Sequence, residues 1–224
     1  PDSLHRVLYL DGDTIVRDDL DTLWTQNLGG CPIGAVMEPT ANRKRRNEMG
    51  IGSFPYYNAG VLLVDLDKWR STHLEQQLLE CCKNRASSLF ANDQDAINVT
   101  LAGRIYPLSI AYNYSNSFYY YPFVFLNRLM PQFDNQVDFN NSFQNPIIIH
   151  YLGEDRPWRN GNTHKYSDDY RFYLSKTNWA DTPMEKGWET YFAFWRLFNN
   201  LVNKAPRLRY AIIDGLIPLF MRKR

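Results

Sequence analysis

The chain has 224 residues, of which 44% are hydrophobic and 22% are charged. This composition suits one large globular domain, with or without a small appendage, and supplies enough apolar side chains for a core. The formal net charge of +1 gives no general attraction to nucleic acid, so we expect no nucleic-acid partner. The sequence contains no uninterrupted apolar run of about 18 residues, which is the length that would predict a membrane span.

The first apolar run, residues 7–10, predicts a short buried strand that ends at Asp11-Gly12-Asp13. Two carboxylates at a strand end suit a hard divalent cation, which takes oxygen ligands and can hold phosphates. An Asp-Gly pair between apolar residues is also a strong signal for a tight hairpin turn. From these residues alone, both interpretations stay open.

The following segments alternate between helical and strand-like patterns, which indicates an α/β fold with a mixed sheet. Residues 39–55 are polar and basic, and predict a long mobile loop of the kind that forms lids. Helices are predicted at 18–24, 67–85 and 92–99, strands at 33–37, 56–66, 105–108 and 146–151, and an irregular aromatic segment at 112–125.

The composition changes near Asp155. Beyond it, Trp, Tyr, Phe and basic residues recur at helical spacing without a clear strand. We therefore expect two parts: a main α/β domain over residues 1–158 and a helical C-terminal extension over residues 159–224.

His150 ends the last predicted strand, as Asp11 and Asp13 follow the first. Two strand ends in one sheet would bring these side chains together as a mixed nitrogen–oxygen site, which Mn²⁺ tolerates. Gly153 would let the backbone approach a phosphate closely, and Arg156 would offer it a planar, bidentate cation. The competing interpretation is a core histidine followed by an ordinary turn.

Two further polar groups have both a structural and a functional interpretation. Asp93 and Gln94 belong to an acidic first helical turn, or form a carboxylate–amide pair that holds sugar hydroxyls. Asn58, just before a strand, belongs to a turn or hydrogen-bonds a polar ligand at the edge of the sheet.

Taken together, the segments 7–13, 56–69, 92–98 and 150–158 resemble glycosyltransferase family 8, and they appear in the family's order. The family includes bacterial galactosyl- and glucosyltransferases of lipooligosaccharide synthesis, and glycogenin. The resemblance implies a GT-A fold, the fold of nucleotide-diphospho-sugar transferases. It also implies retaining transfer of a hexose, galactose or glucose, from a UDP-sugar to a glycan or glycolipid acceptor.

The resemblance further implies which residues bind the metal and the diphosphate. Asp11, Asp13 and His150 match the ligands of Mn²⁺, with Mg²⁺ as the alternative ion, and Gly153 matches a diphosphate contact. Arg156 stands where the family usually has lysine. The positive charge is kept, but the forked guanidinium is bulkier.

On the same resemblance, Asp93 and Gln94 line the donor sugar, with Gln94 near the reacting carbon. Asn58 matches a sugar contact, and Glu38 falls where an acidic sugar-binding residue often lies. None of these side chains is an obvious strong nucleophile. We therefore favour a front-face displacement, in which the acceptor hydroxyl enters on the side of the leaving group.

In the family, uracil and ribose are bound largely by strands that precede the Asp-x-Asp motif. Only ten residues precede Asp11. We therefore expect that the base-binding first part of the domain is missing, that the chain is the later part of a longer protein, and that the isolated chain has little activity.

Residues 188–224 combine aromatic and apolar side chains with cations, which suits an interfacial segment on an anionic membrane. The competing interpretation is a helix packed on the domain with a solvated basic end. The three cysteines form no C-x-x-C pair and favour a reduced compartment. We therefore expect a cytoplasmic protein, peripheral on the inner face of the plasma membrane. The basic residues near the C-terminal end of residues 188–224 are Arg207, Arg209, Arg222, Lys223 and Arg224.

Two rival functions remain. A non-catalytic carbohydrate-binding or scaffold protein would keep the fold without turnover, but it would not need the intact Asp11, Asp13 and His150 set. A metal-dependent phosphohydrolase also uses Asp clusters, but it leaves Asn58 and Gln94 without an evident role.

Overall fold

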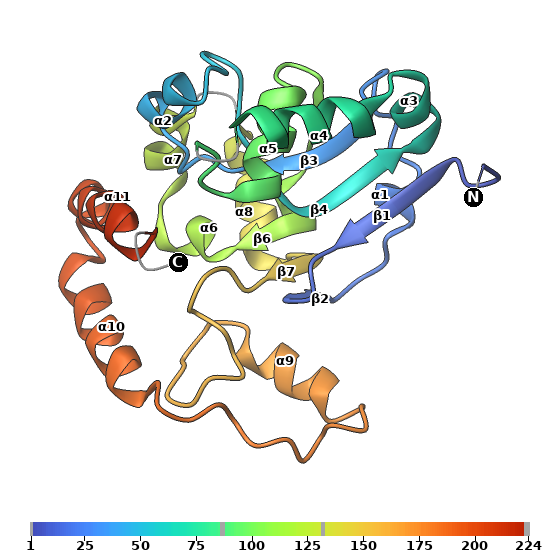
Figure 1. Ribbon diagram of the computed structural model, residues 1–224. Coiled ribbons are helices and arrows are strands. Elements are labelled where there is room, and N and C mark those ends of the chain that lie inside the picture. Colours follow the sequence, from blue (N-terminus) through green and yellow to red (C-terminus); the bar gives the residue numbers. More distant parts are fainter. Residues whose placement is uncertain (1, 86–87, 131–132, 222–224) are drawn as a thin grey trace.

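The computed structural model describes residues 2–85, 88–130 and 133–221 (Figure 1). The strands of the larger sheet, in spatial order, are β1 (Arg6–Leu10), β4 (Tyr57–Asp65), β3 (Ile33–Met37) and β5 (Ile105–Leu108). β4 is antiparallel to both β1 and β3, and β3 is parallel to β5. The mixed sheet predicted from the sequence is therefore confirmed.

A smaller sheet has the order β2 (Thr14–Val16), β7 (Ile148–His150), β6 (Tyr114–Ser115). The prediction that His150 and the Asp pair end strands of one sheet is wrong, because β1 belongs to the larger sheet and β7 to the smaller. The Asp11-Gly12-Asp13 turn instead leads from β1 into β2, and β2 pairs with β7. The chain thus crosses between the two sheets at the predicted metal site.

β4 is the central strand of the larger sheet and is buried along almost its whole length. Helices α3 (Leu66–Ser71) and α5 (Asn92–Thr100) pack on it, and a short 3₁₀ helix at Ile110–Asn113 packs on β3, β4 and β7. Figure 1 shows α3, α4 and α5 along one side of this sheet. Each fully buried aliphatic side chain contributes about 1.5–3 kcal/mol by leaving water, which explains the apolar runs.

The helix predicted over 67–85 is two helices, α3 and α4 (Leu74–Arg85). They are separated at His73, whose φ of 51° lies in the left-handed region and cannot continue a helix. Leu74, directly after the break, is fully buried. The helical spacing of apolar residues runs across this turn, so the sequence alone predicts one helix where the structure has two.

The predicted mobile loop at 39–55 contains a helix, α2 (Arg43–Glu48). The side chain of Asn42 caps it by accepting a hydrogen bond from the backbone N–H of Arg45 at 2.9 Å. This cap satisfies a backbone donor that a helix start otherwise leaves free. Because α2 is polar and basic, it has no apolar stripe by which its sequence could be recognised.

The aromatic segment at 112–125 is also more regular than predicted. It contains β6, α6 (Asn116–Tyr120) and the start of α7 (Phe123–Leu129), and α8 (Gln136–Gln144) follows. The rings of Phe118, Phe133 and Phe139 pack against one another with centroids 6.0–6.5 Å apart. The aromatic residues here form a second layer of core beside the smaller sheet.

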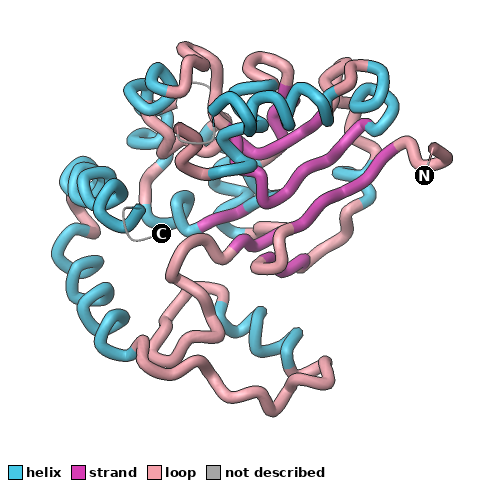
Figure 2. The backbone as a smooth tube through the Cα atoms, in the orientation of Figure 1, coloured by secondary structure: helices cyan, strands magenta, loops and turns pink. Residues whose placement is uncertain are grey.

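The C-terminal part contains three helices, α9 (Ser167–Leu174), α10 (Glu189–Val202) and α11 (Pro206–Met221). Figure 2 shows the loop over residues 175–188 that joins α9 to α10. Within the described ranges, no helix combines the length and apolar character needed to cross a membrane. Of the predicted basic residues, Arg222, Lys223 and Arg224 lie outside the described residues.

Arg209 is buried rather than solvated, with 3% of its surface exposed. Its guanidinium lies 3.9 Å from the ring centroid of Tyr120 and 5.2 Å from that of Trp195, and it donates to Asn199. The neighbouring Tyr210 donates its hydroxyl proton to the carbonyl of Thr40 at 2.8 Å. These two adjacent residues fasten α11 to the main domain.

Replacing the buried cation should therefore destabilise the protein. We expect Arg209→Ala to lower the free energy of unfolding by about 2–4 kcal/mol, because several ring contacts and a buried polar partner are lost. Urea denaturation followed by circular dichroism measures the change. The control is Arg207→Ala, an exposed arginine of the same helix, which should change stability by less than about 0.5 kcal/mol. Equal effects from the two substitutions would contradict the packing described above.

Candidate active site

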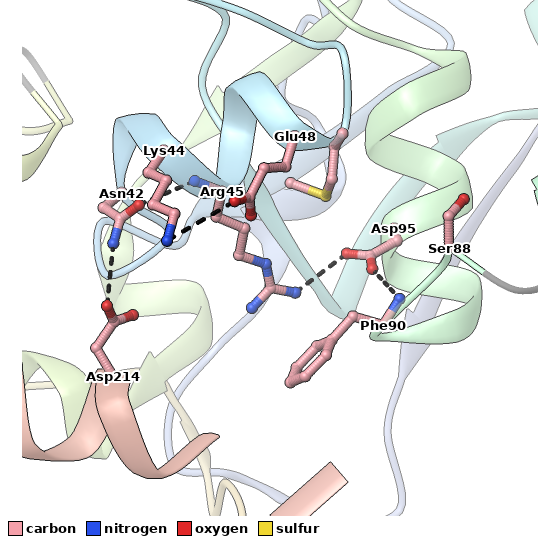
Figure 3. Close-up of a pocket in the computed structure, with 9 residues that line it drawn as sticks. Asn42, Lys44, Arg45, Glu48, Ser88, Phe90, Asp95 and Asp214 are labelled. Atoms are coloured by element: carbon pink, nitrogen blue, oxygen red, sulfur yellow. Dashed lines mark hydrogen bonds and ion pairs between the residues drawn. The ribbon is translucent and has the colours of Figure 1, made fainter. Parts of the chain in front are cut away.

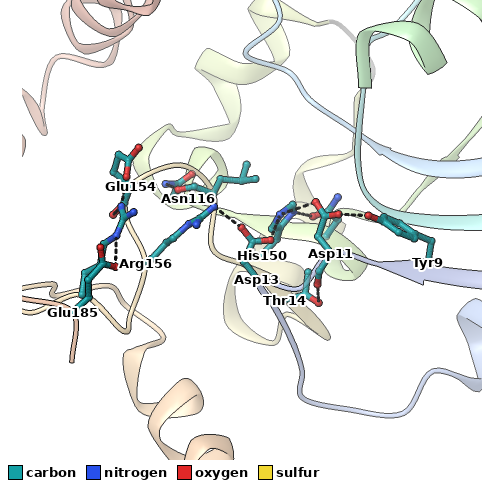
Figure 4. Close-up of polar contacts among 12 residues, drawn as sticks. Tyr9, Asp11, Asp13, Thr14, Asn116, His150, Glu154, Arg156 and Glu185 are labelled. Atoms are coloured by element: carbon teal, nitrogen blue, oxygen red, sulfur yellow. Dashed lines mark hydrogen bonds and ion pairs between the residues drawn. The ribbon is translucent and has the colours of Figure 1, made fainter. Parts of the chain in front are cut away.

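Asp11, Asp13 and His150 lie together where the two sheets meet (Figure 4). Nε2 of His150 is 3.6 Å from Oδ2 of Asp11 and 3.2 Å from Oδ1 of Asp13. The turn is held from both sides: Asp11 N–H donates to the carbonyl of Gly60 at 2.8 Å, and Tyr151 N–H donates to that of Asp13 at 2.9 Å. One ligand atom from each of the three residues lies within 4.8 Å of the others. This spacing suits a single cation.

A relay of side-chain amides orients His150. The N–H of Gly60 donates to Oδ1 of Asn58 at 2.9 Å, which identifies that atom as the amide oxygen. The same oxygen accepts from Nδ2 of Asn113 at 2.8 Å, so Oδ1 of Asn113 faces Nδ1 of His150, also at 2.8 Å. An oxygen without a proton can only accept, so Nδ1 of His150 carries the hydrogen. The lone pair of Nε2 is thus presented to the two carboxylates, as in many metal-binding histidines.

Gly60 is required for this arrangement because the imidazole ring lies directly against it. A Cβ atom at position 60 would lie 2.1 Å from Cε1 and 2.6 Å from Nδ1 of His150. The pairing of β3 with β4 shifts at this point, since Val36 pairs with Asn58 but Ala35 pairs with Leu62. The irregularity releases residues 59–61 from regular pairing with β3 and makes room for the histidine.

Arg156 influences the ionisation of Asp13. Burial acts to raise the pKa of Asp13 and the adjacent guanidinium of Arg156 acts to lower it, and this pKa lies below its usual value. Tyr9 donates to Oδ1 of Asp11 at 2.7 Å. This bond and the negative charge of Asp11 raise the pKa of Tyr9 to about 12, so the phenol keeps its proton.

Arg156 is in contact with the same cluster. Its Nη2 is 3.1 Å from Oδ2 of Asp13, and its guanidinium lies 5.4 Å from the ring centroid of Trp158. Gly153, in the loop that leads to Arg156, has a φ of 66°, which favours glycine, and a side chain there would meet no atom within 4 Å. Asp155 fixes the position of this loop, because its carboxylate accepts hydrogen bonds from the hydroxyl groups of Tyr119 and Tyr120 in α6.

The first turn of α5 lies against the beginning of β4. Oε1 of Gln94 accepts from the N–H of Ala59 at 3.0 Å, and Nε2 donates to the hydroxyl of Tyr56 at 2.9 Å. Asp93, the residue before Gln94 in this turn, is exposed. The hydrogen bond to Ala59 places Gln94 at the start of β4, next to Asn58.

Glu38 follows β3 and is bonded locally. Its Oε1 accepts from the backbone N–H of Thr40 at 3.2 Å and from the hydroxyl of the same residue. Burial raises the pKa of Glu38, and the bonds from Thr40 together with the charge of Arg45 lower it in part.

The structure brings Asp11, Asp13, His150 and Arg156 together, and hydrogen bonds link Asn58 to His150 and Gln94 to β4, whereas Glu38 bonds locally. It also adds residues that the sequence did not single out. Tyr9 contacts Asp11 directly. The other additions act behind the predicted residues. Three of them lie in the segments that resemble the family, but nothing in their spacing marks the role of each, and Asn113 lies outside those segments. These other additions are Tyr56, Gly60, Asn98 and Asn113.

A cavity of about 510 Å³ adjoins the cluster at Gly12. Its walls include the aromatic rings of Trp158, Tyr170 and Trp179 and the carboxylate of Glu185. Aromatic faces together with a few polar groups are typical of sites that take ring-shaped ligands.

Displacing His150 should weaken metal binding. We expect Gly60→Ala to reduce the affinity for Mn²⁺ by about 10- to 100-fold, because the new methyl group forces the imidazole from its hydrogen bond with Asn113. Electron paramagnetic resonance of free Mn²⁺ during titration measures the affinity. Gly215→Ala in α11, where a Cβ would meet nothing within 4 Å, serves as the control and should bind as the unaltered chain does. Unchanged affinity in Gly60→Ala would show that His150 is not a ligand.

Comparison with known proteins identifies the family of this chain. The sequence model of glycosyl transferase family 8 matches residues 2–162. General stress protein A of Bacillus subtilis is 27% identical over 182 residues, covering 80% of this chain and 61% of that protein. The lipopolysaccharide 1,2-glucosyltransferase of Escherichia coli is 25% identical over 184 residues, covering 80% of this chain and 52% of that enzyme.

Solved structures show the same fold. The galactosyltransferase LgtC, in complex with donor and acceptor sugar analogues, matches with a TM-score of 0.64 at 24% identity, covering 84% of this chain and 66% of that one. The glycosyltransferase GlyE of Streptococcus pneumoniae matches with a TM-score of 0.57 at 26% identity, covering 80% of this chain and 41% of that one. The chain thus spans about two thirds or less of the proteins it resembles. It has the GT-A fold and belongs to glycosyltransferase family 8.

Proposed function

We propose that this chain provides the metal-binding and donor-sugar-binding part of a retaining glycosyltransferase. The enzyme would move a hexose, galactose or glucose, from a UDP-sugar to a glycan or glycolipid acceptor. The observation that carries the proposal is the cluster of Asp11, Asp13 and His150 with Arg156 beside it. Two carboxylates and an imidazole suit a divalent ion, and an adjacent guanidinium suits the diphosphate that such an ion holds.

The donor set fits Mn²⁺, with Mg²⁺ as the alternative. Oxygen ligands suit both ions, whereas the imidazole of His150, with Nε2 presented to the cluster, suits Mn²⁺ better. When bound, such an ion supplies Lewis-acid stabilisation of the diphosphate leaving group.

The residues around the cluster would perform the remaining tasks of the donor site. Arg156 would contribute a second cation to the departing diphosphate, and Gly153 would allow the backbone to approach it closely. This arrangement matters because the reacting carbon becomes positively charged as the leaving group departs.

We assign the donor sugar to the surface formed by Gln94, Asp93, Asn58 and Glu38. Gln94 is a neutral amide and Asp93 is exposed, so neither is an activated nucleophile. We therefore propose a front-face displacement, in which the acceptor hydroxyl attacks from the side of the departing diphosphate. Support for a hexose comes from two relatives, a glucosyltransferase and a galactosyltransferase.

We also propose that the protein is cytoplasmic and attaches peripherally to an anionic membrane surface, where a glycolipid acceptor would be found. α10 exposes Phe194, Leu197 and Leu201, with 69%, 56% and 74% of their surfaces exposed. Lys204 and Arg207, next to this apolar face, are also exposed. Exposed apolar side chains beside cations are typical of helices that lie in the membrane interface.

Calorimetric titration of UDP tests the donor site. We expect binding in the presence of Mn²⁺, no binding with EDTA, and at least about a tenfold loss of affinity in Asp13→Ala, because the metal loses a charged ligand. Asp181→Ala, which removes an exposed carboxylate elsewhere, is the matched control and should bind normally. Binding of UDP that is indifferent to EDTA would contradict the proposed site. Metal-independent binding of saccharides without transfer would favour the carbohydrate-binding alternative.

Sedimentation with lipid vesicles tests the membrane proposal. We expect the protein to bind vesicles that contain phosphatidylglycerol and not vesicles of phosphatidylcholine alone, because the cations need anionic headgroups. Leu201→Asp should abolish binding, since it places a charge in the apolar face. Leu79→Asp on α4, at a position with 52% exposure, controls for the added charge. If both variants bind as the unaltered protein does, α10 is not the membrane-binding surface.

A further inference from the structure

A buried carboxylate lies directly behind the proposed donor-sugar residues. Asp95 has no exposed surface, and its oxygens accept four hydrogen bonds. Oδ1 accepts from the hydroxyl of Tyr56 at 2.5 Å and from Nη2 of Arg45 at 3.2 Å. Oδ2 accepts from the backbone N–H groups of Phe90 at 2.6 Å and Ala91 at 2.8 Å. A charged group this deeply buried needs such a full set of donors.

The proton of Tyr56 is committed to this carboxylate. The side chain is almost completely buried, and burial raises the pKa of Tyr56 well above its usual value, so the phenol stays protonated. A phenol has one proton, and Asp95 can only accept it. The oxygen of Tyr56 therefore serves only as an acceptor toward Gln94, whose Nε2 lies 2.9 Å away.

These contacts determine which end of the Gln94 amide points in which direction. The N–H of Ala59 requires an oxygen at one end, and the oxygen of Tyr56 requires an N–H at the other. A rotation of the amide by half a turn would oppose N–H to N–H and oxygen to oxygen. Both hydrogen bonds would be lost at a partly buried position, so one orientation is selected.

We propose that Tyr56, oriented by Asp95, is a positioning residue that holds the Gln94 amide in one orientation for sugar transfer. The inference rests on the proposed function, in which Gln94 faces the reacting carbon of the donor. That carbon gains positive charge in the transition state, so the amide oxygen stabilises it and the amide nitrogen opposes it. The orientation of the amide dipole thus determines whether Gln94 helps or hinders the reaction.

Arg45 connects this network to solvent. It lines a cavity of about 260 Å³. Figure 3 shows its guanidinium pointing toward Asp95, with Asn42, Glu48 and Asp214 nearby. Its guanidinium lies 4.6 Å from the ring centroid of Phe90 and is paired with the buried carboxylate. Arg45 and the Tyr56 hydroxyl thus both donate to the same oxygen of Asp95, so the arginine and the tyrosine belong to one hydrogen-bonded network.

A purely structural role for this network can be separated from a positioning role. The structural task, holding the segment before α5, is performed by the bonds from Phe90 and Ala91 to Asp95. The bond between Tyr56 and Gln94 is not needed for that task. Tyr56→Phe keeps the buried ring and the backbone bonds, and removes the hydroxyl, which bonds to both Gln94 and Asp95.

The test combines a kinetic and a spectroscopic measurement on Tyr56→Phe. Hydrolysis of UDP-galactose and UDP-glucose, which we expect to be slow in this chain, is followed as UDP release over long incubations and gives kcat and KM. We expect kcat to fall by about tenfold and KM to stay within about twofold, because the amide orientation matters in the transition state and not for donor binding. Tyr57→Phe, at the adjacent buried tyrosine, is the control and should leave both constants unchanged.

Nuclear magnetic resonance of the Gln94 side-chain amide tests the orientation without requiring turnover. In the unaltered chain, the two amide protons should exchange slowly and show contacts to the Tyr56 ring. Gln94→Ala assigns these signals by removing them. In Tyr56→Phe we expect both protons to exchange at least about tenfold faster, since the acceptor is lost. If Tyr56→Phe does not fold, Arg45→Met tests the same network from its solvent side, and we again expect the Gln94 amide protons to exchange faster.

The outcomes separate the two proposals. Protected amide signals that depend on Tyr56, in a chain that neither binds nor hydrolyses UDP-sugars, would confirm the orientation and refute the donor-site function. Turnover that Tyr56→Phe leaves unchanged, or Gln94 amide signals that are the same with and without the hydroxyl, would overturn the positioning role.

Discussion

The turn at Asp11-Gly12-Asp13 is the feature on which the rest of the site depends, because it joins the two sheets. The N–H of Asp11 bonds to Gly60 in β4 of the larger sheet, and the carbonyl of Asp13 bonds to Tyr151 beyond β7 of the smaller one. Without this crossing, the carboxylates and His150 would belong to separate surfaces. With it, three metal-ligating groups converge on one point, and Arg156 reaches the same carboxylate from the loop after β7.

The irregularity in β4 supplies the next level of organisation. Ala59 and Gly60 are not paired with β3 in the regular register, so their N–H groups are available to side chains. The N–H of Gly60 donates to Asn58 and starts the relay that orients the histidine, and the N–H of Ala59 donates to the side-chain oxygen of Gln94. Two successive backbone donors thus determine the direction of both amide relays, one toward the metal-binding cluster and one toward the proposed sugar site. This arrangement accounts for a glycine at 60, where any larger residue would displace the imidazole.

Much of the strand framework could be predicted from the sequence, because buried strands leave continuous apolar runs. The strand at Ile33–Met37 and the Asp pair after β1 are examples. The membership of β7 in a second sheet could not be predicted, since the apolar run does not specify its partners. Helix α2 has no apolar stripe, and the relay through Asn113 depends on side chains distant in sequence. Hydrogen-bonded relays have no period, so these parts of the site emerge only from the three-dimensional structure.

The most direct test of this account is a crystal structure of the chain with Mn²⁺ and UDP, with the ion located by its anomalous scattering. The account predicts one Mn²⁺ bound by carboxylate oxygens of Asp11 and Asp13 and by Nε2 of His150, with the diphosphate between the ion and Arg156. An ion bound elsewhere, or a diphosphate that does not approach Arg156, would contradict it.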